Sequence, residues 1–503
     1  MLCVVIKGPR LEEIKQQMQE ALPLADLLEL RFDLFIDFRL DQIETICADF
    51  PLPLIFTLRS ASQGGDSRLS GEERLSWLTL LAGLKPQYLD VEYPDDVSFI
   101  PDWGSSKLIL SHHDLEKTPA DLQELYEEMQ KTPAHFYKIA VKAEDTQTAM
   151  QLVCWRKQHE KNDCIAISMG PAGQISRILS PVIGNPITYA CLNEDPHSPL
   201  GQLSAQRLIN PYQISSLTSQ TAVYGLIGDP VTQSISDITH NHYFKMKNLD
   251  AVYVKIAVLL TQLPSFLTRA KQLPFKGLSV TMPLKEEVLP YLGQIDKEAQ
   301  EIGAVNTLVL QGEQWIGYNT DGKGALNAIE KQVIVRGKRL VILGAGGAAK
   351  AIAYEAHKRG ALITVLNRHI EKAQGVAALC QGVAKGLDQM QHCYDAGYDI
   401  LINCTPCDLP IDPEYLLPQA LIMDIRTKPK NTILLERALK KGCSVVYGYE
   451  MFIEQALLQY ALWGLIDTLP DKNPLEEVAL GALENTLLGF FLKAPFPGIE
   501  HLA

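Results

Sequence analysis

Long hydrophobic runs are missing from this sequence. No uninterrupted apolar stretch reaches the roughly 20 residues that a membrane-spanning helix requires, so a helical membrane protein is not expected. The chain starts directly with the strand-like segment 2–6, and we therefore expect neither a signal peptide nor a transit peptide. These features predict a cytoplasmic protein without a membrane partner.

Basic residues are also fewer than acidic residues. Lys and Arg total 46 against 59 Asp and Glu, which gives a formal net charge of −13. An acidic chain is repelled by the phosphate backbone, so nucleic-acid binding is not expected as a main activity. We expect small-molecule substrates as partners instead.

Regularly spaced cysteines are absent as well. The ten cysteines are scattered without a repeated short spacing, which argues against a disulfide framework. Cys404 and Cys407 have the spacing of a redox motif, but no second pair completes a zinc site. We interpret the cysteines as reduced thiols and expect no bound metal.

Short apolar runs that alternate with amphipathic stretches are abundant. A chain of 503 residues corresponds to two to four domains at about 100–200 residues each, and 47% hydrophobic with 21% charged residues is typical of globular proteins. Residues 1–213 contain eight apolar segments with helical patterns between them. This α/β alternation predicts a (β/α)8 TIM barrel, with an open doubly wound sheet as the alternative. The expected strands are 2–6, 27–31, 54–58, 88–92, 107–111, 136–141, 164–169 and 187–190.

A second α/β module follows a Ser/Thr/Gln-rich segment, 214–221, which we interpret as a linker. The strand pattern then predicts a smaller domain over 222–330 and a Rossmann-type domain over 331–447. Residues 448–503 are expected to form C-terminal helices, the first of which packs back on the smaller domain.

The Rossmann-type domain carries a glycine-rich turn. Residues 344–349 (GAGGAA) follow an apolar strand and open a helix, so their backbone amides can approach a pyrophosphate at the positive helix end. The next strand ends in Asn367 and Arg368, where an NAD-specific fold usually carries a carboxylate. Because a guanidinium pairs well with a 2′-phosphate, the sequence favours NADPH over NADH.

Several motifs in this chain resemble two known enzyme families. Residues 222–465 resemble shikimate dehydrogenase, and residues 1–213 resemble type I 3-dehydroquinate dehydratase; their fused order resembles the bifunctional enzyme of plants and some bacteria. The motifs are YGLIGDP (224–230), SIS (234–236), SVTMPLK (279–285), IGAVNT (302–307), GYNTDG (317–322) and MFIEQA (451–456) for the first family, and ELR (29–31), TLRS (57–60), SHHD (111–114), KIAV (138–141), ISMG (167–170) and PLGQLS (199–204) for the second.

The two resemblances imply consecutive reactions of the shikimate pathway. The first module would dehydrate 3-dehydroquinate to 3-dehydroshikimate through a lysine Schiff base, and the second would reduce that product to shikimate with NADPH. Two alternatives remain open. The second module could oxidise quinate with NAD, or both modules could serve as a non-catalytic sensor, because quinate-pathway repressors reuse these folds. The resemblance also implies a monomer.

The first module offers a lysine in an apolar strand. Burial of Lys138 disfavours its ammonium form, and the neutral amine can attack a ketone. The resemblance implies that His113 moves the protons of the elimination, with the adjacent His112 as the rival. It further implies a set of substrate-binding residues, while Gln63 stands outside this set because the family often has Glu there. The set consists of Glu29, Arg31, Arg59, Arg177, Ser198 and Gln202.

In the second module, carbonyl reduction requires a proton donor beside the hydride donor. The resemblance implies that Lys285 and Asp321 form this catalytic pair. It implies that Ser234 and Ser236 bind the substrate carboxylate and that Thr281, Asn306 and Gln455 bind its hydroxyls. The cofactor-binding residues expected from the turn and the resemblance are Gly344, Ala345, Gly346, Gly347, Ala348, Asn367, Arg368, Thr405 and Gly448.

Overall fold

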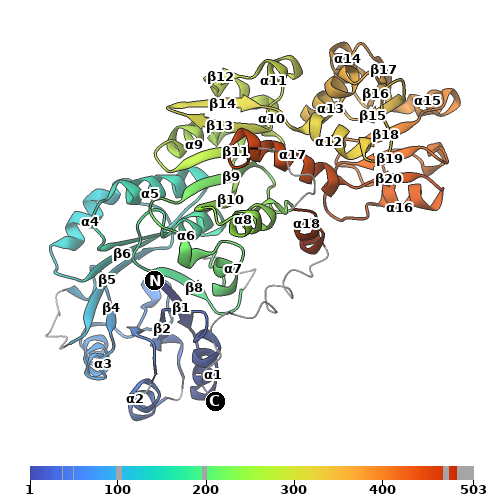
Figure 1. The fold of residues 1–503 in the computed structure, drawn as a ribbon. Coiled ribbons are helices and arrows are strands. Elements are labelled where there is room, and N and C mark those ends of the chain that lie inside the picture. The colour runs from blue at the N-terminus through green and yellow to red at the C-terminus, as the bar shows by residue number, and fades with distance from the viewer. Residues whose placement is uncertain (37, 49, 98–104, 195–200, 468–474, 484–503) are drawn as a thin grey trace. The chain divides into compact units, whose positions relative to one another are not determined.

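The computed structural model describes residues 1–36, 38–48, 50–97, 105–194, 201–467 and 475–483 (Figure 1). The chain divides into two compact units. The first unit contains Met1–Ala222 and two later segments, Asp250–Ile256 and Pro264–Pro274. The second contains Val223–Leu249, Ala257–Leu263 and the chain from Phe275 onward. Two segments of the expected smaller domain therefore belong to the first unit.

Eight parallel strands form the sheet of the first unit, in the order β7-β6-β5-β4-β3-β2-β1-β8 (Figure 1). All but β5 are nearly fully buried, as expected for strands covered on both faces, whereas β5 is longer and is buried over only half of its length. The predicted eight-stranded parallel α/β architecture is confirmed, with strand ends shifted by up to three residues. The strands are β1 (Leu2–Ile6), β2 (Leu27–Arg31), β3 (Leu54–Thr57), β4 (Tyr88–Glu92), β5 (Lys107–Asp114), β6 (Phe136–Lys142), β7 (Cys164–Met169) and β8 (Thr188–Cys191).

Amphipathic helices follow most of these strands. In α5, Asp145 accepts a hydrogen bond from the Thr148 amide at 2.8 Å, a helix N-cap that fixes where the helix begins. Residues Ala149, Leu152 and Val153 of α5 face the core. The helices are α1 (Leu11–Ala21), α2 (Leu40–Ala48), α3 (Gly71–Gly83), α4 (Leu122–Gln130), α5 (Thr146–Gln158), α6 (Gln174–Ile178) and α7 (Ala205–Ile209).

The side chain of Asn185 forms hydrogen bonds with the backbone of β7 at the edge of the sheet. The hydrogen-bonded order of the described strands ends at β7 on one side and at β8 on the other. Asn185, just before β8, accepts a hydrogen bond from the Ala166 amide at 3.0 Å and donates one to the Ala166 carbonyl at 2.9 Å. It thus satisfies both backbone groups of Ala166, as a neighbouring strand would.

The smaller domain of the second unit is built on β9, β11, β13, β14 and β12, which are neighbours in that order. β9 and β11 are parallel, whereas β13 pairs antiparallel with both β11 and β14. The sequence did not predict β12 and β14. The strands are β9 (Ala222–Gly228), β11 (Phe275–Val280), β12 (Gln294–Ile295), β13 (Thr307–Gln311) and β14 (Gln314–Tyr318); the helices are α8 (Ser236–Met246), α10 (Leu284–Glu287), α11 (Lys297–Ile302) and α12 (Asp321–Glu330). β10 (Ala251–Ala257) and α9 (Leu263–Ala270) lie largely in the segments assigned to the first unit.

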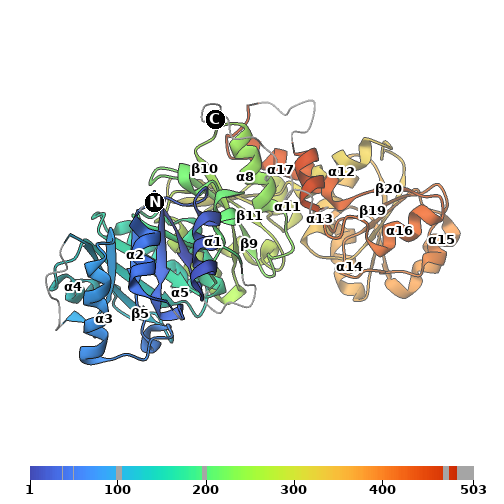
Figure 2. The same cartoon turned by 90° about the horizontal axis from the view of Figure 1, so that it is seen from below.

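The Rossmann-type domain is confirmed. Its six parallel strands have the order β17-β16-β15-β18-β19-β20, and separate hydrophobic clusters lie under the helices of the two faces. Helix α16 lies along β19 and β20 (Figure 2). The strands are β15 (Arg339–Leu343), β16 (Leu362–Asn367), β17 (Val383–Gly386), β18 (Ile400–Asn403), β19 (Leu421–Asp424) and β20 (Ser444–Val446); the helices are α13 (Gly347–Lys358), α14 (Ile370–Leu379), α15 (Met390–Ala396) and α16 (Ile433–Lys440).

Helix α17 (Gly448–Leu462) connects the two domains of the second unit. Gln459 of this helix donates to the Asn306 carbonyl at 3.3 Å, and Trp463, its C-cap, donates to the Leu308 carbonyl at 3.1 Å. Gly277 makes this packing possible, because a Cβ there would lie 2.1 Å from the Trp463 indole nitrogen. A further helix, α18 (Glu476–Leu483), follows. In the described part of the chain, every helix is too short or too polar to cross a bilayer.

Candidate functional site

Lys138 lies inside the barrel between two carboxylates. Its Nζ is 3.5 Å from Glu29 Oε1 and 3.4 Å from Asp90 Oδ2. Lys138 and Glu29 are each 4% exposed and Asp90 is 1% exposed, so these charges have little contact with solvent. Buried charges of this kind persist only when they are paired, and the three groups satisfy one another.

Arg59 extends this network. Its guanidinium donates to Asp90 at 2.8 Å, to Glu92 at 3.0 Å and to Ser111 at 2.8 Å. Burial alone would raise the pKa of Asp90, but the charges of Arg59 and Lys138 outweigh burial and lower it. Asp90 therefore remains an anion in the interior, and it orients the arginine and the lysine together.

Asp90 and Glu92 were missed by the sequence interpretation. Both lie on β4, two residues apart, and therefore face the same side of the sheet. The available signal was a pair of carboxylates at the carboxyl end of a strand, where barrel enzymes place their active sites.

His113 lies near the same cluster of charges. Burial, together with the positive charges of Arg59 and Lys138, lowers the pKa of His113 well below its ordinary value. The imidazole is thus neutral at pH 7 and able to accept a proton. Its Nδ1 is buried and has no hydrogen-bond partner among the described residues. The rival His112 instead places its Nδ1 3.3 Å from the Tyr93 carbonyl.

Gln63 holds the strand that carries His113. Its side-chain oxygen accepts a hydrogen bond from the His113 amide at 3.0 Å, and its nitrogen donates to the Tyr93 carbonyl at 3.1 Å. Both bonds go to backbone atoms, so the amide fixes the position of the histidine through the main chain. The sequence interpretation left Gln63 outside the site.

The remaining residues expected in the first site are less closely grouped. Arg31 pairs with Asp33 at 2.7 Å. Arg177 is 6% exposed, and burial lowers its pKa to about 10. Gln202 accepts a hydrogen bond from Lys7 at 3.4 Å, and Ser198 lies outside the described residues.

The second candidate site contains the pair Lys285 and Asp321. Lys285 Nζ donates to Asp321 Oδ2, and Asn306 Nδ2 donates to the other carboxylate oxygen at 2.8 Å. Asp321 is 4% exposed, whereas the Lys285 side chain is 18% exposed. The lysine is therefore the accessible end of a fixed ion pair.

Asn306 joins this pair to its surroundings. Its amide group also donates to Thr320 Oγ1 at 2.9 Å and to Gln455 Oε1 at 3.4 Å, and its oxygen accepts from the Thr320 amide at 2.9 Å. These contacts bring together the residue that precedes β13, the start of α12, and α17. The structure thus gathers Lys285, Asp321, Asn306 and Gln455 at one place.

Other residues expected to bind the substrate of the second module lie at the start of α8 and directly after β11. Ser234 Oγ donates to Ser236 Oγ at 2.9 Å. The Thr281 amide donates to the Ile227 carbonyl at 2.9 Å. Gly228, with φ of +155°, allows the close approach of Thr281, whose Cγ2 would lie 2.4 Å from a Cβ at that position.

A cavity of about 820 Å³ lies above the glycine-rich turn. Gly344 has a φ of +109°, which favours glycine, and a Cβ on Gly346 would extend into open space. Helix α13 starts at Gly347, directly after Gly346 of the cavity lining, and the first amides of a helix have no partner within the helix. The residues therefore fit a dinucleotide. The cavity is lined by Met282, Glu286, Gly344, Ala345, Gly346, Lys350, Leu366, Asn367, Arg368, His369, Lys372, Gly375, Leu387, Cys404, Thr405, Pro406, Cys407 and Pro410.

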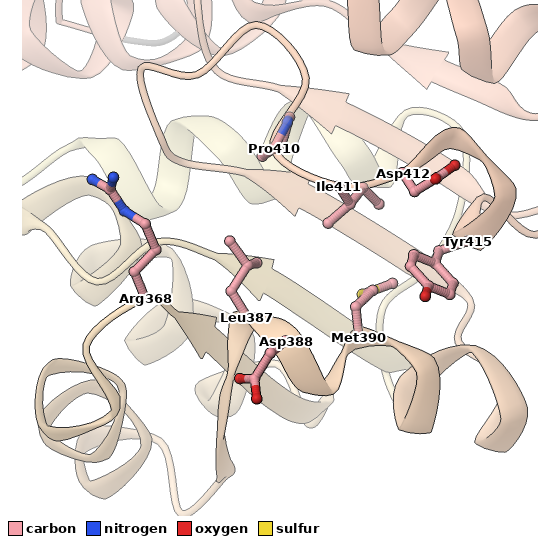
Figure 3. Close-up of a pocket in the computed structure, with 8 residues that line it drawn as sticks. All are labelled: Arg368, Leu387, Asp388, Met390, Pro410, Ile411, Asp412 and Tyr415. Atoms are coloured by element: carbon pink, nitrogen blue, oxygen red, sulfur yellow. The ribbon is translucent and has the colours of Figure 1, made fainter.

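A second cavity, of about 560 Å³, shares Arg368, Leu387 and Pro410 with the first. Figure 3 shows Arg368 at one end, Asp412 and Tyr415 at the other, and the apolar side chains of Leu387, Met390 and Ile411 between them. Arg368 therefore lines both cavities. Two further cations of the larger cavity, Lys350 and Lys372, were missed by the sequence interpretation, although Lys372 follows Arg368 by only four residues.

Two further residues expected to bind the cofactor have structural contacts. Thr405 donates through its hydroxyl to Asn403 at 2.8 Å and lines the larger cavity. Gly448 begins α17, and a Cβ there would lie 2.2 Å from the Arg426 carbonyl oxygen. Gly448 does not line this cavity in the described part of the chain, and neither do Gly347 and Ala348 of the first helical turn.

Comparison with known proteins covers nearly the whole chain. Residues 2–219 match the family model of type I 3-dehydroquinase, residues 226–308 the shikimate dehydrogenase substrate binding domain, and residues 327–434 shikimate/quinate 5-dehydrogenase. The chain is 37% identical over 471 residues to the shikimate biosynthesis protein AroDE of Chlamydia pneumoniae, covering 92% of this chain and 95% of that protein.

Two further relatives support the same division. The chain is 32% identical over 495 residues to the chloroplastic bifunctional 3-dehydroquinate dehydratase/shikimate dehydrogenase of Arabidopsis thaliana, covering 92% of this chain and 82% of that protein. It is 41% identical over 252 residues to the shikimate dehydrogenase (NADP(+)) of Pyrococcus furiosus, covering 49% of this chain and 92% of that protein. The chain therefore belongs to the family of bifunctional 3-dehydroquinate dehydratase/shikimate dehydrogenases.

Proposed function

We propose that this enzyme dehydrates 3-dehydroquinate in its first module with Lys138 as the Schiff-base lysine. The observation that carries this proposal is a buried amine held between Glu29 and Asp90 beside a neutral His113. Once a carboxylate has accepted the lysine proton, the amine attacks the substrate ketone and water leaves, which gives a cationic iminium. The buried carboxylates stabilise that cation.

His113 is proposed to carry out the proton transfers of the elimination. Its neutral imidazole removes a proton from the carbon next to the iminium and then protonates the departing hydroxyl. Gln63 keeps the histidine at the required position through the main chain. Arg59, Arg177 and Gln202 are proposed to hold the hydroxyls and the carboxylate of the substrate.

In the second module, Lys285 is proposed to donate the proton that completes carbonyl reduction. Asp321 orients the lysine and accepts a hydrogen bond from a substrate hydroxyl, and Asn306 holds Asp321 in place. Ser234 and Ser236 are proposed to bind the substrate carboxylate, and Thr281 and Gln455 its hydroxyls. NADPH supplies the hydride when it is bound.

NADP is proposed to bind in the larger cavity. We propose that the turn 344–348 and the amides of α13 bind the pyrophosphate, with Thr405 at the side of the cavity. Asn367, Arg368 and Lys372 line the same cavity and are proposed to bind the adenosine and its 2′-phosphate. Gly448 is proposed to act indirectly, by allowing α17 to approach Arg426.

The proposed function is tested by supplying 3-dehydroquinate as the only carbon substrate and following NADPH at 340 nm. Consumption of NADPH requires both modules, because the second acts only on the product of the first. Rates with shikimate and NADP should greatly exceed those with quinate and NAD. A protein that is inert with both 3-dehydroquinate and 3-dehydroshikimate would instead act as a sensor.

Arg368→Ala is expected to raise the KM for NADPH by about 10- to 100-fold, because a charged hydrogen bond contributes roughly 1.5–3 kcal/mol. The KM for NADH should change little, since NADH has no 2′-phosphate. Steady-state kinetics with both cofactors measure the change. Arg336→Ala removes an exposed arginine of the same domain and serves as control. Equal losses with NADPH and NADH would contradict the assignment.

We also propose that the enzyme is a cytoplasmic monomer. The ten cysteines are free, which suits a reducing compartment. A stable dimer in light scattering of the purified chain would contradict the monomer.

A further inference from the structure

An aromatic ring contacts the reacting nitrogen of the first module. The Lys138 ammonium lies 3.9 Å from the centroid of the Tyr189 ring, well inside the range of a cation–π contact. Tyr189 lies on β8 and is 4% exposed, and it belongs to the hydrophobic cluster inside the barrel. Glu29, Asp90 and the ring of Tyr189 therefore surround Lys138 Nζ.

The contact is made by the ring and not by the hydroxyl. The Tyr189 hydroxyl oxygen is buried and has no hydrogen-bond partner among the described residues. Burial and the charge of Glu29 raise the pKa of Tyr189 well above its ordinary value, so the phenol stays neutral. A phenolate would pair with the cation as a third anion, whereas a neutral ring offers only its electron-rich face.

From this geometry we infer that Tyr189 is a catalytic residue of the dehydratase and that its ring face stabilises the iminium cation on Lys138. The inference rests on the proposed role of Lys138. In imine formation, Nζ loses one hydrogen and bonds to the ketone carbon. The ketone oxygen leaves as water with that hydrogen and one added proton. The positive charge remains on the nitrogen, which is already positioned over the ring.

The ring attracts the iminium cation without being able to accept a proton from it, which the carboxylates cannot do. Glu29 and Asp90 stabilise a positive charge, but each can also accept the proton of the ammonium and release it elsewhere. An aromatic face attracts the cation without accepting a proton or a covalent bond. Tyr189 also occupies, with apolar atoms, a side of the nitrogen that water would otherwise reach, which protects the imine from early hydrolysis.

Borohydride trapping tests the inference directly. Sodium borohydride reduces the iminium to a stable secondary amine, and mass spectrometry of the intact chain measures the fraction modified in the presence of 3-dehydroshikimate. Tyr189→Leu keeps an apolar side chain but removes the ring. It is expected to lower the trapped fraction at subsaturating ligand on the order of tenfold, the factor that a desolvated cation–π contact supplies.

Conservative variants separate the ring from the packing. Tyr189→Phe should recover most of the adduct lost in Tyr189→Leu, because the ring is retained and the lost hydroxyl has no partner. Fluorinated phenylalanines at position 189 weaken the ring face stepwise at nearly constant size, so the trapped fraction should fall with each fluorine. The fluorinated series also tests the role of the ring face if Tyr189→Leu does not fold.

Tyr88 provides a matched control. It is a buried aromatic residue of the same cluster, 6% exposed, and its ring contacts Phe136. Tyr88→Leu should lower the melting temperature but leave the trapped fraction of the folded protein at the wild-type value. A trapped fraction independent of fluorination would overturn the role of Tyr189 alone. Absence of any adduct on Lys138 in the wild type would overturn the proposed function itself.

Discussion

Lys138→Ala is expected to reduce the dehydration of 3-dehydroquinate by more than about 10⁴-fold, because the covalent route is lost entirely. Reduction of 3-dehydroshikimate should stay within about twofold of the wild type, since the second module has catalytic candidates of its own, Lys285 and Asp321. The coupled NADPH assay measures both: the variant should be inactive with 3-dehydroquinate and active with 3-dehydroshikimate.

Removal of the lysine also leaves Glu29 and Asp90 without one of their cations, which destabilises a buried network by roughly 3–5 kcal/mol. Lys138→Arg separates this effect from catalysis, because a guanidinium keeps the charge but does not form an imine. It should be inactive yet more stable than Lys138→Ala. Lys142→Ala, an exposed lysine on the same strand, should retain activity. Substantial dehydration by Lys138→Arg would rule out the Schiff base.

Lys285→Ala is expected to lower kcat for 3-dehydroshikimate reduction by about 10²- to 10⁴-fold, the range for loss of a positioned general acid. Dehydration should continue, so 3-dehydroshikimate should accumulate from 3-dehydroquinate. Its ultraviolet absorbance and the unused NADPH report the two steps in one sample.

Lys323 offers a matched control for this experiment. It lies on α12, two residues after Asp321, and pairs with Glu298 at 2.8 Å on the surface. Lys323→Ala should reduce 3-dehydroshikimate at nearly the wild-type rate. If Lys285→Ala changed only KM, the lysine would bind substrate and another group would supply the proton.

Much of the fold was predictable because its signals are local. Strand segments such as 27–31 and 164–169 are short apolar runs, and a helix start such as Asp145 is fixed by residues three positions apart. Strands β12 and β14, which the sequence did not predict, show the limit of this reasoning. β12 has only two residues, which is too short for any periodic signal.

The candidate sites were predictable where one segment carries the chemistry. Lys138 stands out as a lysine in an apolar strand, and the turn 344–349 has its glycines at fixed positions. The partners of these residues were not predictable in the same way. Asp90 meets Lys138 only because β4 and β6 are both strands of one curved sheet, with β5 between them.

The sequence by itself determined the alternation of strands and helices, the glycine-rich turn and the position of Lys138 in an apolar strand, because each depends on residues close together in the chain. The tertiary structure alone decided which charges surround that lysine, that Tyr189 lies against it, and that Gln63 holds His113 through the main chain. These contacts join residues from 48 to 109 positions apart. Side-chain packing and the pairing of buried charges can select them only once the strands are in place.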